Sequence, residues 1–150
     1  MDGNAGVTII PALTGLGAPH WKPNAKGMIL GLTRNTTKAH IVRAALEAIA
    51  LQSNDLIELI QKECPAVQFE SVLVDGGASA NDWLMQLQSD VSNITVSRPE
   101  SVEATALGAA MCAQMGASEP SRSNPTIFRP KSDQSSLTSH WKEIFTTFIT

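Results

Sequence analysis

The fold of this chain is decided by the stretch from Ser71 to Asn81, which reads SVLVDGGASAN. It begins with apolar, β-branched residues and runs into Asp82–Val91, where apolar residues recur at helical spacing. This pattern predicts a strand, a glycine turn and a helix. Two glycines at such a junction allow positive φ and let a ligand approach the free N–H groups at the helix start.

By itself, the glycine pair has two explanations. A tight turn from strand to helix favours glycine for its backbone alone, and short glycine motifs recur by chance. A turn that holds a nucleotide needs glycine so that the ligand can come close to the backbone. The turn residues alone leave both explanations open.

Length and composition narrow the class of protein. The chain has 150 residues, of which 43% are hydrophobic and 17% charged, as in an ordinary soluble globular domain. A net charge of -3 without a dense Lys/Arg cluster argues against a nucleic-acid surface and favours a small substrate. No leader or membrane-spanning stretch is visible, so we expect a cytoplasmic protein without membrane contact. Cys64 and Cys112 are expected to be buried thiols with no disulfide or metal role.

Two short strands and a long helix are expected before the glycine turn. Val7–Ile10 and Gly27–Leu32 have strand patterns, and Lys38–Glu63 has a helical pattern that the hydroxyl of Thr36 or Thr37 can cap. The expected apolar stripe of this helix comprises Ile41, Ala45, Ile49, Leu56 and Ile60. Alanines in its middle permit close packing, so we expect a central buried helix.

A second strand and helix are expected after the turn. Ile94–Pro99 reads as a strand and Thr105–Gly116 as a helix with a very small face. Glycine inside a helix lowers its stability by roughly 1 kcal/mol relative to alanine. Gly108 within the predicted helix therefore predicts a close contact that requires glycine there. Alternating strands and helices predict parallel pairing with crossover helices.

Two aromatic segments have competing interpretations. His20 and Trp21 can touch a ligand, but burying aromatic area to pin the loop of residues 14–23 is the favoured interpretation. The amphipathic helix that begins at Leu137 can bind a membrane, a partner or its own fold. Its polar face is not strongly basic, which favours docking onto its own fold.

Four segments together match one family. They are Pro11–Trp21 (PALTGLGAPHW), Gly27–Leu32 followed by His40–Glu47, Val74–Asn81 continuing through Met85–Asp90, and Arg98–Glu100 with Glu103–Ala110. In this order they resemble the C-terminal portion of the sugar and polyol kinases, whose two lobes share the actin/hexokinase ATPase fold. The Thr14–Pro19 loop favours the glycerol kinase branch.

The resemblance implies an α/β fold: a partial ribonuclease H-like (actin-like ATPase) lobe, with a short, mostly parallel sheet packed with long helices. Residues 1–117 would be the C-terminal nucleotide-binding lobe without its opening strands. Residues 118–136 would be a connector, and residues 137–150 a C-terminal amphipathic helix. The missing strands suggest a truncated product, one part of a split gene or an excised piece, with an unprotected sheet edge.

The resemblance also implies where a nucleotide binds. Gly77 would lie against the adenosine end of ATP or ADP, the co-substrate, and Asn81 would be a polar contact one turn into the helix. Gly76 and Ala78 would be close-packing neighbours in the same cofactor-binding segment. Magnesium is expected only with the nucleotide. No catalytic or metal-binding residue is assigned, because those of the family precede the matched part.

The expected function is therefore that of the ATP-binding C-terminal portion of a glycerol kinase, which transfers the ATP γ-phosphate to glycerol to give glycerol 3-phosphate. Glycerol would be bound through the missing N-terminal portion, so the chain alone is expected to be inactive. Two alternatives stay open: a non-catalytic structural or interaction module, and a portion of a pentulose or hexulose kinase. An oligomer or a complementing chain also stays open as a partner.

Overall fold

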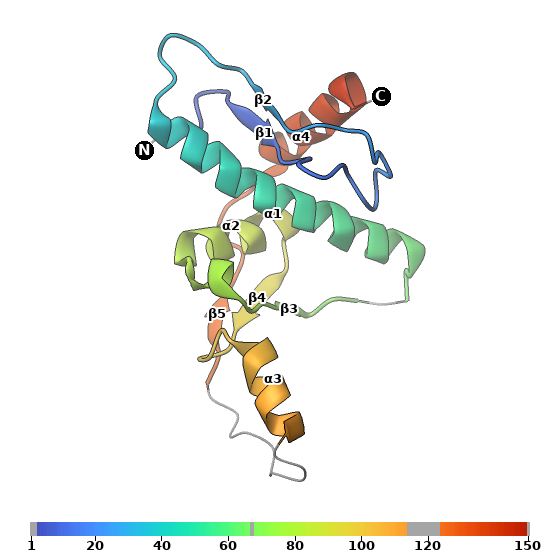
Figure 1. Ribbon diagram of the computed structural model, residues 1–150, viewed down its shortest axis with the longest axis vertical. Helices are drawn as coiled ribbons and strands as arrows, with labels where there is room; N and C mark the ends of the chain where they lie inside the picture. Colours follow the sequence, from blue (N-terminus) through green and yellow to red (C-terminus); the bar gives the residue numbers. More distant parts are fainter. Residues whose placement is uncertain (1–2, 67, 114–123, 150) are drawn as a thin grey trace. The chain divides into compact units, whose positions relative to one another are not determined.

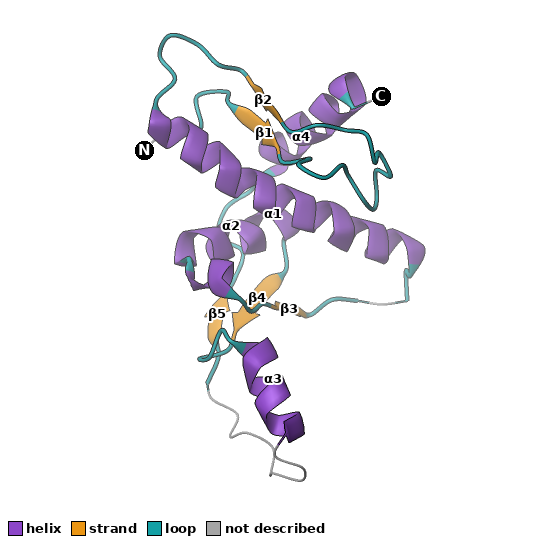
Figure 2. Cartoon of the chain, viewed as in Figure 1, coloured by secondary structure: helices purple, strands orange, loops and turns teal. Residues whose placement is uncertain are grey.

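The computed structural model describes residues 3–66, 68–113 and 124–149. The chain forms two compact units, one of Met1–Gln68 with Ser132–Thr150 and one of Phe69–Lys131. Their α-helices and strands are labelled in Figure 1, and Figure 2 separates helices from strands by colour. The first is called unit 1 and the second unit 2. None of the helices in the described ranges is long and apolar enough to cross a membrane.

Unit 1 is built on the helix α1 (Lys38–Glu63), whose bounds confirm the predicted helix. Thr37 is its N-cap, and its hydroxyl accepts from the backbone N–H of His40 at 3.4 Å. The His40 ring accepts in return from the Thr37 N–H at 3.2 Å, which completes a reciprocal capping box. Of the two threonines that could cap the helix, the structure therefore selects Thr37.

The two predicted strands of unit 1 are present as β1 (Thr8–Ile10) and β2 (Met28–Leu30). They pair antiparallel, with Ile9 opposite Ile29, and β1 packs against α1. The apolar core of this contact is fully or almost fully buried and includes Val7, Ile10, Ala44, Ala48 and Leu51. The small alanine side chains of α1 let the strand come close.

The buried face of α1 differs from the predicted one. Ile49, Leu56 and Ile60 are 44%, 43% and 45% exposed, so the predicted stripe does not face the core of this chain. The buried residues of the helix are Ala44, Glu47, Ala48, Ala50, Leu51, Asn54 and Asp55. The prediction was wrong because apolar periodicity shows only which face of a helix is more hydrophobic. Tertiary packing decides which face is covered.

The last helix, α4 (Ser135–Phe148), docks within unit 1. Trp141, Ile144 and Phe145 are buried on its inner face. The Lys142 ammonium forms an ion pair with Glu58 of α1 at 2.8 Å. This arrangement confirms the predicted docking of the terminal helix onto its own fold.

Unit 2 contains the predicted strand, turn and helix. Its elements are β3 (Ser71–Leu73), the 3₁₀ helix η1 (Gly77–Ala80), α2 (Asp82–Ser92), β4 (Thr95–Arg98), α3 (Ala104–Ala113) and β5 (Thr126–Phe128). β3 and β4 pair in parallel, with Val72 opposite Val96, which confirms the crossover through α2. β5 pairs antiparallel with β4, so the strand order is β3-β4-β5 and the sheet is mixed rather than mostly parallel.

β5 lies inside the segment expected to be a connector. Side chains of α2 hold its end: the Ser89 hydroxyl donates to the Phe128 carbonyl at 3.1 Å, and the Gln86 amide donates to the Arg129 carbonyl at 2.8 Å. These partners lie 39 and 43 residues apart in the chain, so no local pattern could have predicted the strand. Residues 118–123 and the predicted helix end at Gly116 lie outside the described residues.

Two expectations about buried small residues are wrong. A Cβ built on Gly108 would meet no atom of the described residues within 4 Å, and α3 has no buried residue along its described length, so no close contact with the described part of the chain requires this glycine. Cys64 and Cys112 are exposed rather than buried. Cys64 stands at the exposed end of α1, where its N–H donates to the Ile60 carbonyl at 2.8 Å, and Cys112 lies on the unburied α3.

Candidate functional site

The glycine turn between β3 and α2 is the candidate site, and Gly76 sets its shape. This residue has φ 81° and ψ 168°, a region that is essentially restricted to glycine. Its N–H donates to the Val102 carbonyl at 2.7 Å. Its carbonyl accepts from the N–H and the hydroxyl of Ser79, at 3.0 and 2.7 Å. Since a Cβ there would meet no atom of the described residues within 4 Å, backbone conformation rather than close packing against them requires glycine at this position.

Gly77 has a different environment from Gly76. Its φ lies outside the left-handed region, and a Cβ on it would meet nothing within 4 Å. Gly77 and Ala78 are both exposed, while Ser79 behind them is buried. Neither the conformation nor the described protein atoms around it therefore require glycine at position 77.

Asn81 is the N-cap of α2 rather than a residue one turn into the helix. Its side-chain oxygen accepts from the Leu84 N–H at 3.1 Å, and its own N–H donates to the Ala78 carbonyl at 3.2 Å. The cap uses the oxygen of the amide, because a free backbone N–H of the first turn needs an acceptor. The group left for a ligand is the amide nitrogen, which is a donor.

Sequence reasoning missed Arg98, the last residue of β4, as a part of this site. Its Nη1 lies 2.7 Å from the carbonyl oxygen of Ser79 and 2.7 Å from Oδ1 of Asp82. Its guanidinium lies over the Phe128 ring, 5.2 Å from the centroid. An arginine at the carboxyl end of a strand that pairs in parallel with the strand entering the turn is the signal that could have identified it.

A second polar cluster lies in unit 1. Oδ2 of Asp55 accepts from the Trp141 indole N–H at 2.9 Å and lies 3.0 Å from Nε2 of His20. The His20 ring stacks on Phe145 with centroids 4.0 Å apart. His20 therefore pins its loop, which confirms the favoured interpretation for that residue, whereas Trp21 is exposed and does not. A cavity of about 160 Å³ adjoins His20 and Asp55.

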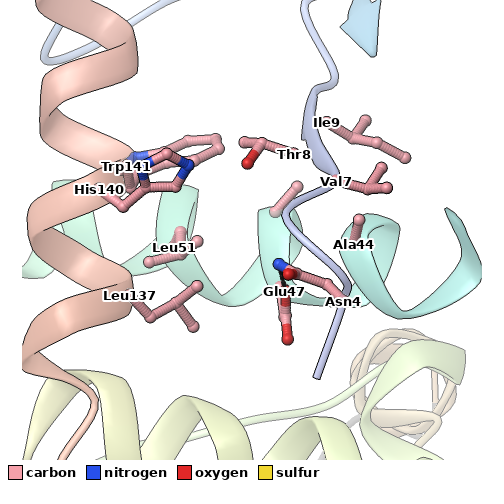
Figure 3. A pocket seen from close by; sticks show the side chains of 11 residues that line it. Asn4, Val7, Thr8, Ile9, Ala44, Glu47, Leu51, Leu137, His140 and Trp141 are labelled. Carbon is pink, nitrogen blue, oxygen red and sulfur yellow. Dashed lines mark hydrogen bonds between the residues drawn. The ribbon is translucent and has the colours of Figure 1, made fainter. Parts of the chain in front are cut away.

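A small pocket between β1, α1 and α4 is too small for a substrate. Figure 3 shows the side chains of Glu47, Leu51 and Trp141 around it. Its volume is about 10 Å³, which holds at most about one water. Asn4 and Arg43 satisfy the buried Glu47 carboxylate at 2.6 and 2.8 Å, so this carboxylate has a structural role. Among the described residues, no group of three or more His, Cys, Asp or Glu could hold a metal ion.

Comparison with known proteins identifies close relatives. Residues 2–117 match the C-terminal domain of the FGGY family of carbohydrate kinases. A glycerol kinase of Bdellovibrio bacteriovorus is 56% identical over 117 residues, which are 78% of this chain and 23% of that protein. A glycerol kinase of Saccharolobus islandicus is 50% identical over 116 residues, which are 77% of this chain and 23% of that protein. The chain thus spans about a quarter of the length of the curated relatives it matches.

Solved structures agree with the sequence relatives. The crystal structure of Plasmodium falciparum glycerol kinase with ADP has a TM-score of 0.82 and 32% identity, and covers 100% of this chain and 32% of its own. A xylulose kinase of Bifidobacterium adolescentis has a TM-score of 0.68 and 26% identity, and covers 95% of this chain and 29% of its own. These neighbours confirm the α/β fold class and the actin-like ATPase architecture.

Proposed function

The chain belongs to the FGGY family of carbohydrate kinases, and from this premise we propose that it supplies the adenosine-binding part of an ATP-dependent glycerol kinase. The complete activity would transfer the γ-phosphate of ATP to glycerol and give glycerol 3-phosphate. Among the solved structures, a glycerol kinase is 32% identical with a TM-score of 0.82, against 26% and 0.68 for a xylulose kinase, and this difference favours glycerol over a pentulose. Residues 1–117 would carry the nucleotide-binding lobe, in line with the family match to residues 2–117.

The main support for this proposal is a glycine at position 77 that the described protein itself does not require. Gly76 next to it is explained by its backbone conformation, but nothing in the described protein requires a glycine at 77. A ligand that lies against the backbone would explain the missing side chain. The N–H groups of Gly77 and Ala78 precede the first internal hydrogen bond of the turn, which Ser79 donates to Gly76. We propose that the adenosine end of ATP or ADP lies there, with the Asn81 amide as a donor.

The remaining catalytic groups would come from outside this chain. Phosphoryl transfer needs a residue that orients the attacking hydroxyl, groups that grip the β- and γ-phosphates, and a metal ion. The described residues of this chain contain no acidic cluster for a metal, so we propose that magnesium arrives with the nucleotide. Glycerol would be bound by the part of a full-length kinase that this chain does not match. The isolated chain should therefore show no glycerol phosphorylation.

Titration with ADP by calorimetry tests the proposal. We expect weak binding by the wild-type chain and loss of binding in Gly77→Leu. Gly17→Leu is the matched control, because Gly17 also lies outside the left-handed region and a Cβ there also meets nothing within 4 Å. All three proteins should keep the same far-UV circular dichroism. A well-folded wild type that binds no ADP, or a Gly77→Leu variant that binds as tightly as the wild type, would overturn the proposal.

One observation favours a second function, that of a non-catalytic module which pairs with another chain. β3 is an edge strand of its sheet, and its Leu73 side chain is 79% exposed. An exposed edge of this kind can pair with a strand from another molecule. A defined complex in a size measurement, together with no ADP binding, would favour this function over the kinase portion.

A further inference from the structure

Arg98 contacts one residue before Asn81 and one residue after it. One atom of its guanidinium, Nη1, lies 2.7 Å from the Ser79 carbonyl oxygen and 2.7 Å from Oδ1 of Asp82. The first partner belongs to η1 and the second is the first residue of α2. The arginine therefore links the end of η1 to the start of α2, and Asn81 stands between these two elements. Arg98 itself lies on β4, 17 residues after Asn81 in the chain.

The guanidinium is itself held in place. The Phe128 ring of β5 lies beneath it at 5.2 Å, and the Arg98 side chain is only 15% exposed. An arginine packed in this way keeps its charge and directs its N–H groups along fixed lines. It thus acts as a rigid link from β4 and β5 to the glycine turn.

The two hydrogen bonds of Arg98 differ in how much they stabilise the turn. The Asp82 side chain is 75% exposed, so solvent screens this ion pair and it adds little. Ser79 is buried, and its carbonyl would lose a charge-assisted partner if the guanidinium were removed. The bond to Ser79 is therefore the one that holds the turn.

We propose that Arg98 is a positioning residue: it holds the Gly77–Ala80 turn, and with it the Asn81 amide, in the conformation that receives the ligand. Arg98 acts through Ser79 and touches no ligand itself. The identity of the ligand as a nucleotide rests on the proposed function, whereas the positioning of the turn does not. Loss of the arginine leaves a turn that samples other conformations, and the apparent affinity falls by the fraction of molecules that remain competent.

Amide hydrogen exchange of the whole chain, combined with ADP titration, tests this role. Arg98→Met keeps much of the apolar length and removes the charge and the donors. We expect the protected amides of Ser79 and Asn81 to exchange roughly ten- to a hundredfold faster, the range expected for one lost charge-assisted hydrogen bond. The Val74 amide, which donates to the Ser97 carbonyl directly after the end of β3, should exchange as in the wild type. The ADP dissociation constant should rise by a similar factor.

Arg129→Met is the matched control, since it removes the same charge from an exposed residue of the same unit. It should leave both measurements unchanged. Unchanged exchange at Ser79 and Asn81 in Arg98→Met would overturn the inference, and so would an equal rise at Val74, which indicates general destabilisation. If the wild type binds no ADP, the proposed function fails. Faster amide exchange in Arg98→Met that is confined to Ser79 and Asn81 would then still support the positioning role.

Discussion

The indole N–H of Trp141 donates to Oδ2 of Asp55 at 2.9 Å, across 86 residues of sequence. Both residues are buried, and the hydrogen bond joins α4 to the C-terminal half of α1. The His20 ring completes the cluster through the same carboxylate oxygen, at 3.0 Å. A single side chain thus holds a loop, the central helix and the terminal helix of unit 1 together.

Replacing the shared acceptor should destabilise unit 1. In Asp55→Ala the Trp141 N–H is left buried without its acceptor, a loss that costs about 1–3 kcal/mol. Urea unfolding followed by tryptophan fluorescence would measure the change. Glu143→Ala, on the exposed side of α4, should stay within about 0.5 kcal/mol of the wild type. Equal midpoints for Asp55→Ala and Glu143→Ala would contradict the anchoring role.

The two glycines of the turn should respond differently to alanine. Gly76→Ala places a Cβ in a conformation that is essentially restricted to glycine, at a cost of about 1–3 kcal/mol. Gly77→Ala adds a methyl group to open space and should leave stability close to that of the wild type. Thermal unfolding monitored by circular dichroism would separate the two variants. The reverse order of stability would show that the turn has another conformation in solution.

Asn81→Asp should separate the capping role of this residue from its contact with a ligand. Aspartate keeps an oxygen that can accept from the Leu84 N–H, so the stability of α2 should be retained. It lacks the amide donor, so ADP affinity should fall about five- to tenfold, as expected for one lost hydrogen bond. Asn81→Ala should lose both affinity and, by about 1 kcal/mol, stability. Calorimetry measures the ADP affinity and urea unfolding measures the stability. Full ADP affinity in Asn81→Asp would refute the contact between the Asn81 amide and the ligand.

Leu73→Lys should reduce self-association of the isolated chain. Leu73 lies on the edge strand β3 and is 79% exposed, and a charged side chain on an edge opposes pairing with a second molecule. Light scattering at increasing protein concentration would measure the effect. Thr126→Lys is the comparison at the β5 edge, where Pro125 and Pro130 flank the strand and already limit pairing. Equal scattering by wild type and Leu73→Lys would mean that the β3 edge does not mediate association.

Much of the local structure could be predicted because its causes are local. Thr37 and its partner His40 lie three residues apart, and Pro65 directly follows Cys64, the C-cap of α1, so both ends of the helix have signals in the sequence. The glycine pair between an apolar strand and an amphipathic helix likewise predicts the β3-turn-α2 unit. The role of Asn81 was only partly predictable, because its place at the cap depends on where η1 ends.

The sequence by itself determined the helices, four of the strands, the parallel β3–β4 pair and the family, because short-range periodicity, capping residues and ordered motifs carry that information. Only the tertiary structure decided which face of α1 is buried, that Thr126–Phe128 joins the sheet, and that Arg98 reaches the Ser79 carbonyl. Each of these depends on contacts between residues distant in the chain. Such contacts are chosen by the packing of whole elements, which no local pattern of residues specifies.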